Sequence, residues 1–364
     1  MGVYLAYPFC AQKCTFCNFA SGVFSRELER SYLEALRTEL ARFEWSWRPA
    51  TLYLGGGTPS RIEPAALESL LAAAPAYPWV EATLEATPGS VTPQRARLWR
   101  RLGINRVSLG VQSFVAREIS RTGRRHTAET VAAEVAILRA AGILNFNLDL
   151  IAGLPSQTPA SWRESLAWVE RLEAPHVSVY MLEIDEDSRL GREILHRGPR
   201  YGAPDALPEE QVADLYEAAV EWLEAAGVRR YEIANFARPG WESRHNLKYW
   251  RLEPYAGFGA DAHSFDGRLR RRNAESPAEY THLVLRGASP CVESVPARIE
   301  EERFFLGLRL REGFRPTPEE RTCFAPPIRR FLEEGLLESE GDLLRLTARG
   351  VMLSNEVFQE FVNL

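Results

Sequence analysis

The first 19 residues, MGVYLAYPFCAQKCTFCNF (1–19), place three cysteines directly after a short apolar segment. Residues 3–9 are typical of a buried strand. Cys10, Cys14 and Cys17 follow with C-x₃-C-x₂-C spacing, and the position where a fourth ligand is sought is Phe19, which cannot bind a metal. In a cytosolic protein, clustered thiols indicate metal or redox chemistry rather than a disulfide.

The first two thirds of the chain alternate between strand-like and helix-like patterns. Strands are predicted at 3–9, 50–55, 80–86, 106–111, 146–153, 176–184 and 229–237, with helices at 26–44, 63–74, 92–103, 127–142, 159–173 and 208–227. Such alternation implies parallel strands joined by helical crossovers. The units predict either an open α/β sheet or most of a (β/α) barrel.

The last third of the chain has a different pattern. Residues 238–297 are rich in Gly, Pro and Arg, and we interpret them as a connecting region. Residues 298–364 predict helix, hairpin and helix, as in a winged-helix-like module. The hairpin tip, Glu-Gly-Asp at 340–342, is acidic and argues against DNA binding. The predicted domains are therefore 1–237, 238–297 and 298–364.

Composition narrows the class of protein. The 364 residues are 45% hydrophobic and 26% charged, with a net charge of -5, which argues against a general nucleic-acid-binding surface. No apolar run reaches the roughly 18 residues that span a bilayer. No signal peptide is visible, so we expect a cytoplasmic protein. Cys291 and Cys323 stand alone and are interpreted as free structural thiols.

Each of the first six predicted strands has unusual residues near its carboxyl end. Cys10, the GGGTP segment at 55–59 and Gln112 with Ser113 follow strands, Glu85 and residues 181–184 end strands, and Asp149 lies within one. Because the carboxyl ends of parallel strands share one rim, these features are expected to line one binding site. Each of them alone also fits an ordinary turn, a helix cap or a solvated side chain.

Three cysteines without a fourth ligand favour an iron–sulfur cluster over zinc. A structural zinc site needs four ligands, and no His or further Cys lies near Cys17. Three thiolates on one loop can hold three irons of a [4Fe–4S] cluster, which leaves the fourth iron open. An open iron can bind the amine and carboxylate of a small molecule, so the missing ligand is predicted to be a substrate or cofactor.

These motifs resemble those of the radical S-adenosylmethionine superfamily. Further strings resemble the oxygen-independent coproporphyrinogen III oxidases and, most closely, their haem-chaperone relatives: YPFCAQKCTFCNF, LYLGGGTPS, EATPG, RVSLGVQSF, NLDLIAGLPSQT and HNLKYW. The resemblance is strong over residues 1–290 and looser beyond. It implies a partial (β/α)6 barrel followed by a small helical, winged-helix-like module.

The resemblance also implies site residues. The three cysteines would bind the [4Fe–4S] cluster, and S-adenosylmethionine would contact Tyr4, Gly56, Gly57, Thr58, Glu85, Gln112, Arg124 and Asp149. Arg124 is a suitable partner for the cofactor carboxylate, and either acidic side chain could accept from ribose hydroxyls or the ammonium group. The alternative for the polar members, structural hydrogen bonds at a barrel rim, stays open.

Two functions compete within this family: a haem chaperone and a coproporphyrinogen III oxidase that decarboxylates by radical chemistry. The oxidases resemble C-x₃-C-x₂-C-x-C, whereas Phe19 stands at the last position here, as in the chaperones. The oxidases also carry an N-terminal segment before the first strand, which here begins by residue 3. We therefore predict the chaperone, with no assigned catalytic residue and no conversion of coproporphyrinogen, and keep the oxidase as the alternative.

The third distinguishing feature, HNLKYW (245–250), matches the haem-binding motif of the chaperones. Its predicted haem contacts are His245, Asn246, Tyr249 and Trp250, since imidazole ligates haem iron and aromatic rings stack on a macrocycle. The alternative is that His245 and Asn246 form hydrogen bonds within a loop while the two aromatic side chains cover the open side of the barrel. His263 is a second, weaker candidate ligand.

The resemblance finally implies partners. Haem and acceptor haemoproteins are expected, among them membrane respiratory enzymes, and no nucleic acid. Dimerisation and peripheral association with a membrane are compatible with the family.

Overall fold

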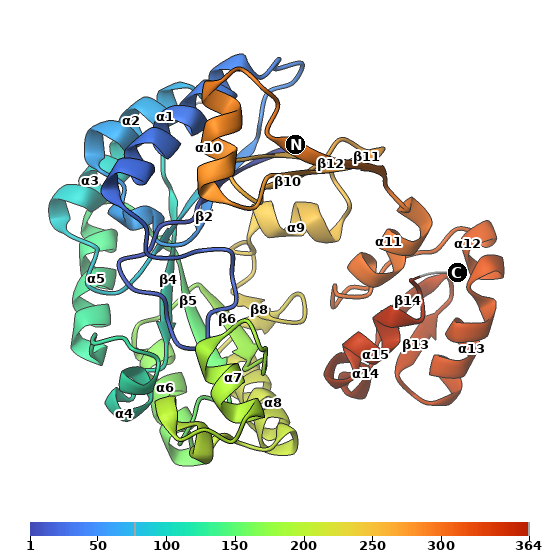
Figure 1. Ribbon diagram of the computed structural model, residues 1–364. Coiled ribbons are helices and arrows are strands. Elements are labelled where there is room, and N and C mark those ends of the chain that lie inside the picture. The colour runs from blue at the N-terminus through green and yellow to red at the C-terminus, as the bar shows by residue number, and fades with distance from the viewer. Residues whose placement is uncertain (76–77, 363–364) are drawn as a thin grey trace.

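The computed structural model describes residues 1–75 and 78–362 (Figure 1). Six parallel strands form its centre: β1 (Gly2–Tyr7), β2 (Thr51–Gly56), β3 (Glu81–Ala86), β4 (Arg106–Gln112), β5 (Asn145–Ala152) and β6 (His176–Met181). They are neighbours in chain order. Their apolar side chains form a continuous core. The predicted partial (β/α)6 barrel is therefore confirmed.

Helices cover the outer face of these strands (Figure 1). They are α1 (Arg26–Arg42), α2 (Pro64–Ala72), α3 (Pro93–Arg101), α5 (Ala128–Ala140), α6 (Pro159–Arg171) and α8 (Glu209–Ala225). The shorter helices α4 (Ala116–Arg121) and α7 (Arg189–Leu195) lie beside the cysteine loop instead, where Thr15 bonds to the backbone of Thr122 and Leu190. Two 3₁₀ turns, η1 (Pro59–Arg61) and η2 (Arg200–Asp205), complete this part of the chain. Side chains fix several starts. Thr127 and Thr158, for example, form capping boxes that satisfy the first free N–H groups of α5 and α6.

Residues 238–297, interpreted from the sequence as a connecting region, contain strands that extend the main sheet. After α9 (Arg244–Trp250), strand β9 (Tyr255–Phe258) pairs in parallel with β1. Strands β10 (His263–Phe265), β11 (Leu269–Asn273) and β12 (Cys291–Pro296) continue the same sheet, and α10 (Pro277–Leu285) packs on α1. The arginine-rich sequence of β11 lacks the apolar residues that mark a buried strand, because this end of the sheet is only partly buried.

The predicted strand at 229–237 is instead a tight antiparallel pair, β7 (Arg229–Arg230) and β8 (Asn235–Ala237), at the opposite edge of the sheet. The main sheet thus runs in the order β12-β11-β10-β9-β1-β2-β3-β4-β5-β6-β8-β7. Because of the added strands, β1 is an interior strand, and its side chains meet residues from both ends of the chain.

The C-terminal module contains α11 (Ile299–Gly307), α12 (Pro318–Cys323), α13 (Ala325–Glu333), the hairpin β13 (Leu337–Glu340) and β14 (Leu343–Leu346), α14 (Ala348–Met352) and α15 (Ser354–Gln359). It is the winged-helix-like arrangement that the sequence predicts, except that the last helix is broken at Leu353. Arg309 joins it to the barrel through an ion pair with the buried Glu232 at 3.3 Å. Among the described residues, no helix is both long and apolar enough to cross a membrane.

Candidate functional site

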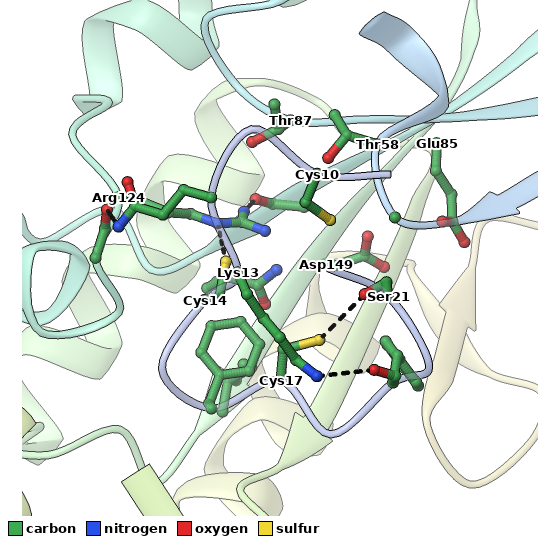
Figure 2. Close-up of a pocket in the computed structure, with 18 of the residues that line it drawn as sticks. Cys10, Lys13, Cys14, Cys17, Ser21, Thr58, Glu85, Thr87, Arg124 and Asp149 are labelled. Carbon is green, nitrogen blue, oxygen red and sulfur yellow. Dashed lines mark hydrogen bonds between the residues drawn. The ribbon is translucent and has the colours of Figure 1, made fainter. Parts of the chain in front are cut away.

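A cavity of about 690 Å³ opens at the carboxyl ends of the parallel strands (Figure 2). Of the residues predicted from the sequence, it is lined by Cys10, Cys14, Cys17, Gly56, Gly57, Thr58, Glu85, Gln112, Arg124 and Asp149. Residues that lie more than 100 positions apart in the chain therefore meet at one rim, as parallel topology requires.

The cysteines lie on one loop between β1 and α1, and this loop is held at several points. The N–H of Cys10 donates to the carbonyl of Gly22 at 2.8 Å, and Lys13 Nζ donates to the carbonyl of Phe19 at 3.0 Å. Thr15 is buried in the middle of the loop, and its hydroxyl donates to the carbonyl of Arg121 at 2.9 Å. These bonds leave the three thiols partly exposed to the same cavity (Figure 2).

The chemistry of this donor set suits a cluster better than a single metal ion. In residues 1–75 and 78–362, no three His, Cys, Asp or Glu side chains are grouped closely enough to hold one ion. In an iron–sulfur cluster each thiolate binds a different iron, so the thiols need not converge on one point. Arg124 Nε donates to Cys14 Sγ at 3.2 Å, so a guanidinium group lies directly beside this thiol in the cavity. Burial raises the pKa of Cys10, and hydrogen bonds from Thr58 and Ser21 oppose that rise.

The glycine run after β2 lets two strand ends approach closely. Gly56 has φ of +111°, a conformation that favours glycine, and its N–H donates to Glu85 Oε2 at 2.9 Å. A Cβ on Gly57 would lie 2.7 Å from the carbonyl oxygen of Phe9, which rules out a side chain there without backbone movement. The GGGTP segment is therefore more than an ordinary turn, because it joins β2 to the cysteine loop.

Two carboxylates from β3 and β5 face the cavity. Glu85 accepts from Tyr53 Oη at 2.9 Å as well as from Gly56, yet burial dominates and raises its pKa to about 7. Asp149 accepts from Asn147 Nδ2 at 2.7 Å, and burial raises its pKa too. Both groups are therefore buried carboxyls that already accept hydrogen bonds from protein donors, and burial favours their neutral form.

The end of β4 is irregular at the site. A bulge lies between Gly110 and Gln112, and Gln112 has φ of +71°, which is unusual for a residue with a side chain. The guanidinium group of Arg124 donates to the carbonyl of Gly110, which stands next to this bulge. Strained backbone next to a polar cavity commonly marks a functional position.

Other predicted residues do not reach this cavity. Tyr4 instead lines a second cavity, together with Tyr249 and Trp250. Tyr4 is therefore not placed among the other predicted S-adenosylmethionine contacts. Its ring stacks on that of Tyr53, which lines the first cavity, with centroids 6.0 Å apart.

The geometry of His245 does not favour the predicted haem ligation. The residue is 1% exposed, Nδ1 lies 2.9 Å from Thr51 Oγ1, and Nε2 lies 2.8 Å from Tyr249 Oη. Burial also lowers its pKa to about 3, so the ring is neutral. Both ring nitrogens are occupied, and the arrangement matches the structural alternative that the sequence left open. Asn246 lies in the first turn of α9, where its N–H donates to Ser243 Oγ at 3.3 Å.

Sequence reasoning missed some residues of the first cavity. Tyr53, Ser108 and Tyr180 line it and come from the same strands as the predicted residues. Strand alternation could have identified Tyr53, which lies two positions before Gly55 and so on the same face of β2. Tyr180 stands near the end of β6, where the sequence has no distinguishing polar pattern.

Parallel strands, a three-cysteine loop after the first of them and a Gly-rich turn after the second define a radical S-adenosylmethionine fold. Residues 4–169 match the Radical SAM superfamily, and residues 298–353 match the HemN C-terminal domain. The solved structure of coproporphyrinogen III oxidase (HemN) from Escherichia coli is similar, with a TM-score of 0.85 at 22% identity, covering 99% of this chain and 89% of that one.

Two curated relatives match over nearly their full length. The heme chaperone HemW of Bacillus subtilis is 32% identical, covering 99% of this chain and 98% of its own. The heme chaperone HemW of Escherichia coli is 34% identical, covering 100% of this chain and 98% of its own. The chain therefore belongs to the HemW family of radical S-adenosylmethionine proteins.

Proposed function

We propose that this protein is a haem chaperone that binds a [4Fe–4S] cluster and S-adenosylmethionine and delivers haem to acceptor haemoproteins. The observation that carries the proposal is the meeting of three thiols, a Gly-rich turn, two buried carboxylates and Arg124 at one cavity in a HemW-family chain. Membrane respiratory enzymes are the proposed acceptors, reached from the cytoplasm by a protein that associates peripherally with the membrane, as a monomer or a homodimer.

Each group at the first cavity has a proposed role. Cys10, Cys14 and Cys17 would hold the cluster, which when bound offers one iron to the amine and carboxylate of S-adenosylmethionine. Backbone groups of 56–58 would contact the methionine end. Glu85 and Asp149 would accept hydrogen bonds from ammonium or hydroxyl groups, because both are buried carboxylates that face the cavity.

The alternative function is oxidative decarboxylation of coproporphyrinogen, favoured by the shared fold with HemN. Phe19 counts against it. This side chain stands where the oxidases carry a further cysteine, and it is 67% exposed at the edge of the cavity. An aromatic ring there cannot supply a thiol for chemistry on a porphyrinogen. We therefore propose that the protein does not convert coproporphyrinogen.

The test combines two assays on the full chain after anaerobic cluster reconstitution. Haemin titration followed in the Soret band should show saturable, stoichiometric binding. Incubation with coproporphyrinogen III, S-adenosylmethionine and a reductant should give no protoporphyrinogen, while HemN in parallel supplies the positive control. Cysteine-dependent product formation without haem binding would establish the oxidase instead.

A further inference from the structure

A row of polar side chains lies inside the barrel, next to Asp149. Strand register pairs Ser108 of β4 with Asn147 of β5, and Asn147 with His176 of β6. Paired residues on adjacent strands point to the same face, so these three side chains form one layer of the barrel interior. Their exposed fractions are 3%, 2% and 0%, respectively, and buried polar groups of this kind need hydrogen-bond partners.

His176 connects this layer to Tyr231, and the contacts fix which ring nitrogen carries the proton. The N–H of Ser243 donates to Tyr231 Oη at 3.3 Å, so the proton of the phenol is directed to His176 Nε2, 2.8 Å away. Burial lowers the pKa of His176 well below its usual value, so the ring is neutral and carries a single proton. Because Nε2 accepts, that proton lies on Nδ1, which donates to Asn147 Oδ1 at 2.7 Å.

The orientation of the Asn147 amide follows from this bond. Since Oδ1 faces the imidazole, Nδ2 faces Asp149 and donates to its Oδ1 at 2.7 Å. The same nitrogen donates to Ser108 Oγ at 2.7 Å, and that hydroxyl donates to Asp149 Oδ2 at 3.2 Å. Both carboxylate oxygens of Asp149 are thus held by Asn147, one directly and the other through Ser108.

The surroundings of Asp149 favour an ionised carboxylate against the effect of burial. Burial raises its pKa, while hydrogen bonds from Ser178 and Asn147 and the charge of Arg106 oppose that rise. Arg106 is 2% exposed and lies two residues before Ser108, on the same face of β4. A carboxylate that is held by donors of the barrel interior keeps its remaining lone pairs for a ligand in the cysteine cavity (Figure 2).

We infer that Asn147 and His176 are positioning residues for Asp149, whose carboxylate they orient as an acceptor for S-adenosylmethionine. This inference rests on the proposed function and adds two residues that line neither cavity. His176 acts through Asn147, because its N–H fixes which atom of the amide faces the carboxylate. The alternative is that the layer only ties three strands together, in which case its loss lowers stability and leaves the affinity for the ligand unchanged.

The first test exchanges the Asn147 amide for a carboxylate. Asn147→Asp keeps the shape of the side chain but places an acceptor where Asp149 needs a donor, and two adjacent carboxylates repel each other. The affinity for S-adenosylmethionine is measured by equilibrium dialysis with the full chain after cluster reconstitution. It should fall about tenfold or more, the effect expected when a hydrogen bond to a charged group is lost.

Asn105→Asp is the matched control. Asn105 stands before β4, at the opposite end of the barrel from the cysteine cavity, and lines neither cavity. Its Oδ1 accepts from the N–H of Ala82 at 2.8 Å, a bond that aspartate keeps, while its Nδ2 donates to the carbonyl of Val80 at 3.3 Å, a bond that aspartate loses. This variant should therefore lose stability but bind S-adenosylmethionine as wild type does.

A pair of variants tests His176 separately. In His176→Asn the amide nitrogen can take the position of Nδ1 and donate to Asn147, whereas in His176→Gln it extends to the position of Nε2 and leaves Nδ1 without a replacement. The affinity for S-adenosylmethionine should stay close to wild type in His176→Asn and fall about tenfold in His176→Gln. Stability alone would not separate them in this way, because each variant keeps one of the two hydrogen bonds.

Urea unfolding of every variant records stability alongside affinity. Wild-type affinity in Asn147→Asp or in His176→Gln would overturn the inference and leave the proposed function standing. An equal loss in Asn105→Asp and Asn147→Asp would also overturn it, because affinity would then follow stability. If neither His176 variant folds, the two asparagine variants decide. Absence of S-adenosylmethionine binding by the reconstituted wild-type chain would overturn the proposed function itself.

Discussion

The two cavities of this protein are built in opposite ways. The cysteine cavity takes its residues from the ends of successive parallel strands and from the loops that directly follow them. The aromatic cavity takes residue 4, a helix and three strands after residue 243, and Leu306 of the C-terminal module. The two cavities meet at the stacked rings of Tyr4, which lines the second, and Tyr53, which lines the first.

This difference shows that one fold can form a polar cavity and an aromatic cavity side by side. The first cavity offers thiols, carboxylates and backbone N–H groups, so its ligands are expected to be held by directional bonds. The second is lined mainly by aromatic side chains, so a ligand there is expected to be held by apolar contact area. The two cavities therefore present unlike surfaces.

The largest expected effect is the loss of the cluster in Cys14→Ser, with no change at the second cavity. Serine does not supply the thiolate that the iron requires. Iron and sulfide content after reconstitution should fall to the level of the apo-protein. Haem affinity should stay at the wild-type value, because the predicted haem contacts Tyr249 and Trp250 line the second cavity and the cysteine loop does not.

Cys323→Ser is the matched control, since this thiol is exposed in the C-terminal module and outside both cavities. It should retain the full cluster. A parallel loss of haem binding in Cys14→Ser would break the comparison, because it would show that the two cavities are coupled.

The sequence predicts the first cavity well and the second poorly, for a physical reason. Cys10, Gly56, Glu85 and Asp149 each lie in the second half of a parallel strand or shortly after it, and parallel topology brings such positions together whatever the details of packing. No local sequence pattern predicts that β9 pairs with β1. That pairing joins residues about 250 positions apart and is decided by tertiary packing.

The same limit applies to His245. A histidine followed by Tyr and Trp has the composition of a haem site, but whether its nitrogens are free depends on Thr51, a residue of another strand. For Tyr4 the sequence predicts the strand, whereas the cavity that its side chain lines depends on residues after 243.

A smaller effect is expected for Glu85→Gln at the first cavity, measured as stability against pH. The folded pKa of Glu85 is about 7, above the unfolded value of 4.5. The folded state therefore binds the proton more tightly, and this contribution to stability is full below pH 4.5 and is lost as the pH rises through 7. Glutamine does not titrate, so the variant should gain stability relative to wild type over this range, by up to about 3 kcal/mol.

Urea unfolding of both proteins at several pH values between 4.5 and 8 checks this. A pH-independent change in unfolding free energy caused by the amide does not affect the result, because only the pH dependence of the unfolding free energy is compared between the two proteins. Glu68→Gln, on the exposed side of α2, is the control and should run parallel to wild type. If the unfolding free energies of Glu85→Gln and wild type change with pH in the same way, the Glu85 carboxylate is better solvated than its burial indicates.

The smallest effect, Tyr249→Phe, tests the structural role of the motif histidine at the second cavity. Removing the phenol leaves His245 Nε2 buried without its 2.8 Å partner, which should cost about 1–3 kcal/mol of unfolding free energy.

Tyr255→Phe is the control. Its phenol accepts from Arg270 at 3.0 Å, and because that guanidinium group keeps its bonds to Glu302, the cost should be lower. Urea unfolding at pH 8 measures both variants with His245 neutral.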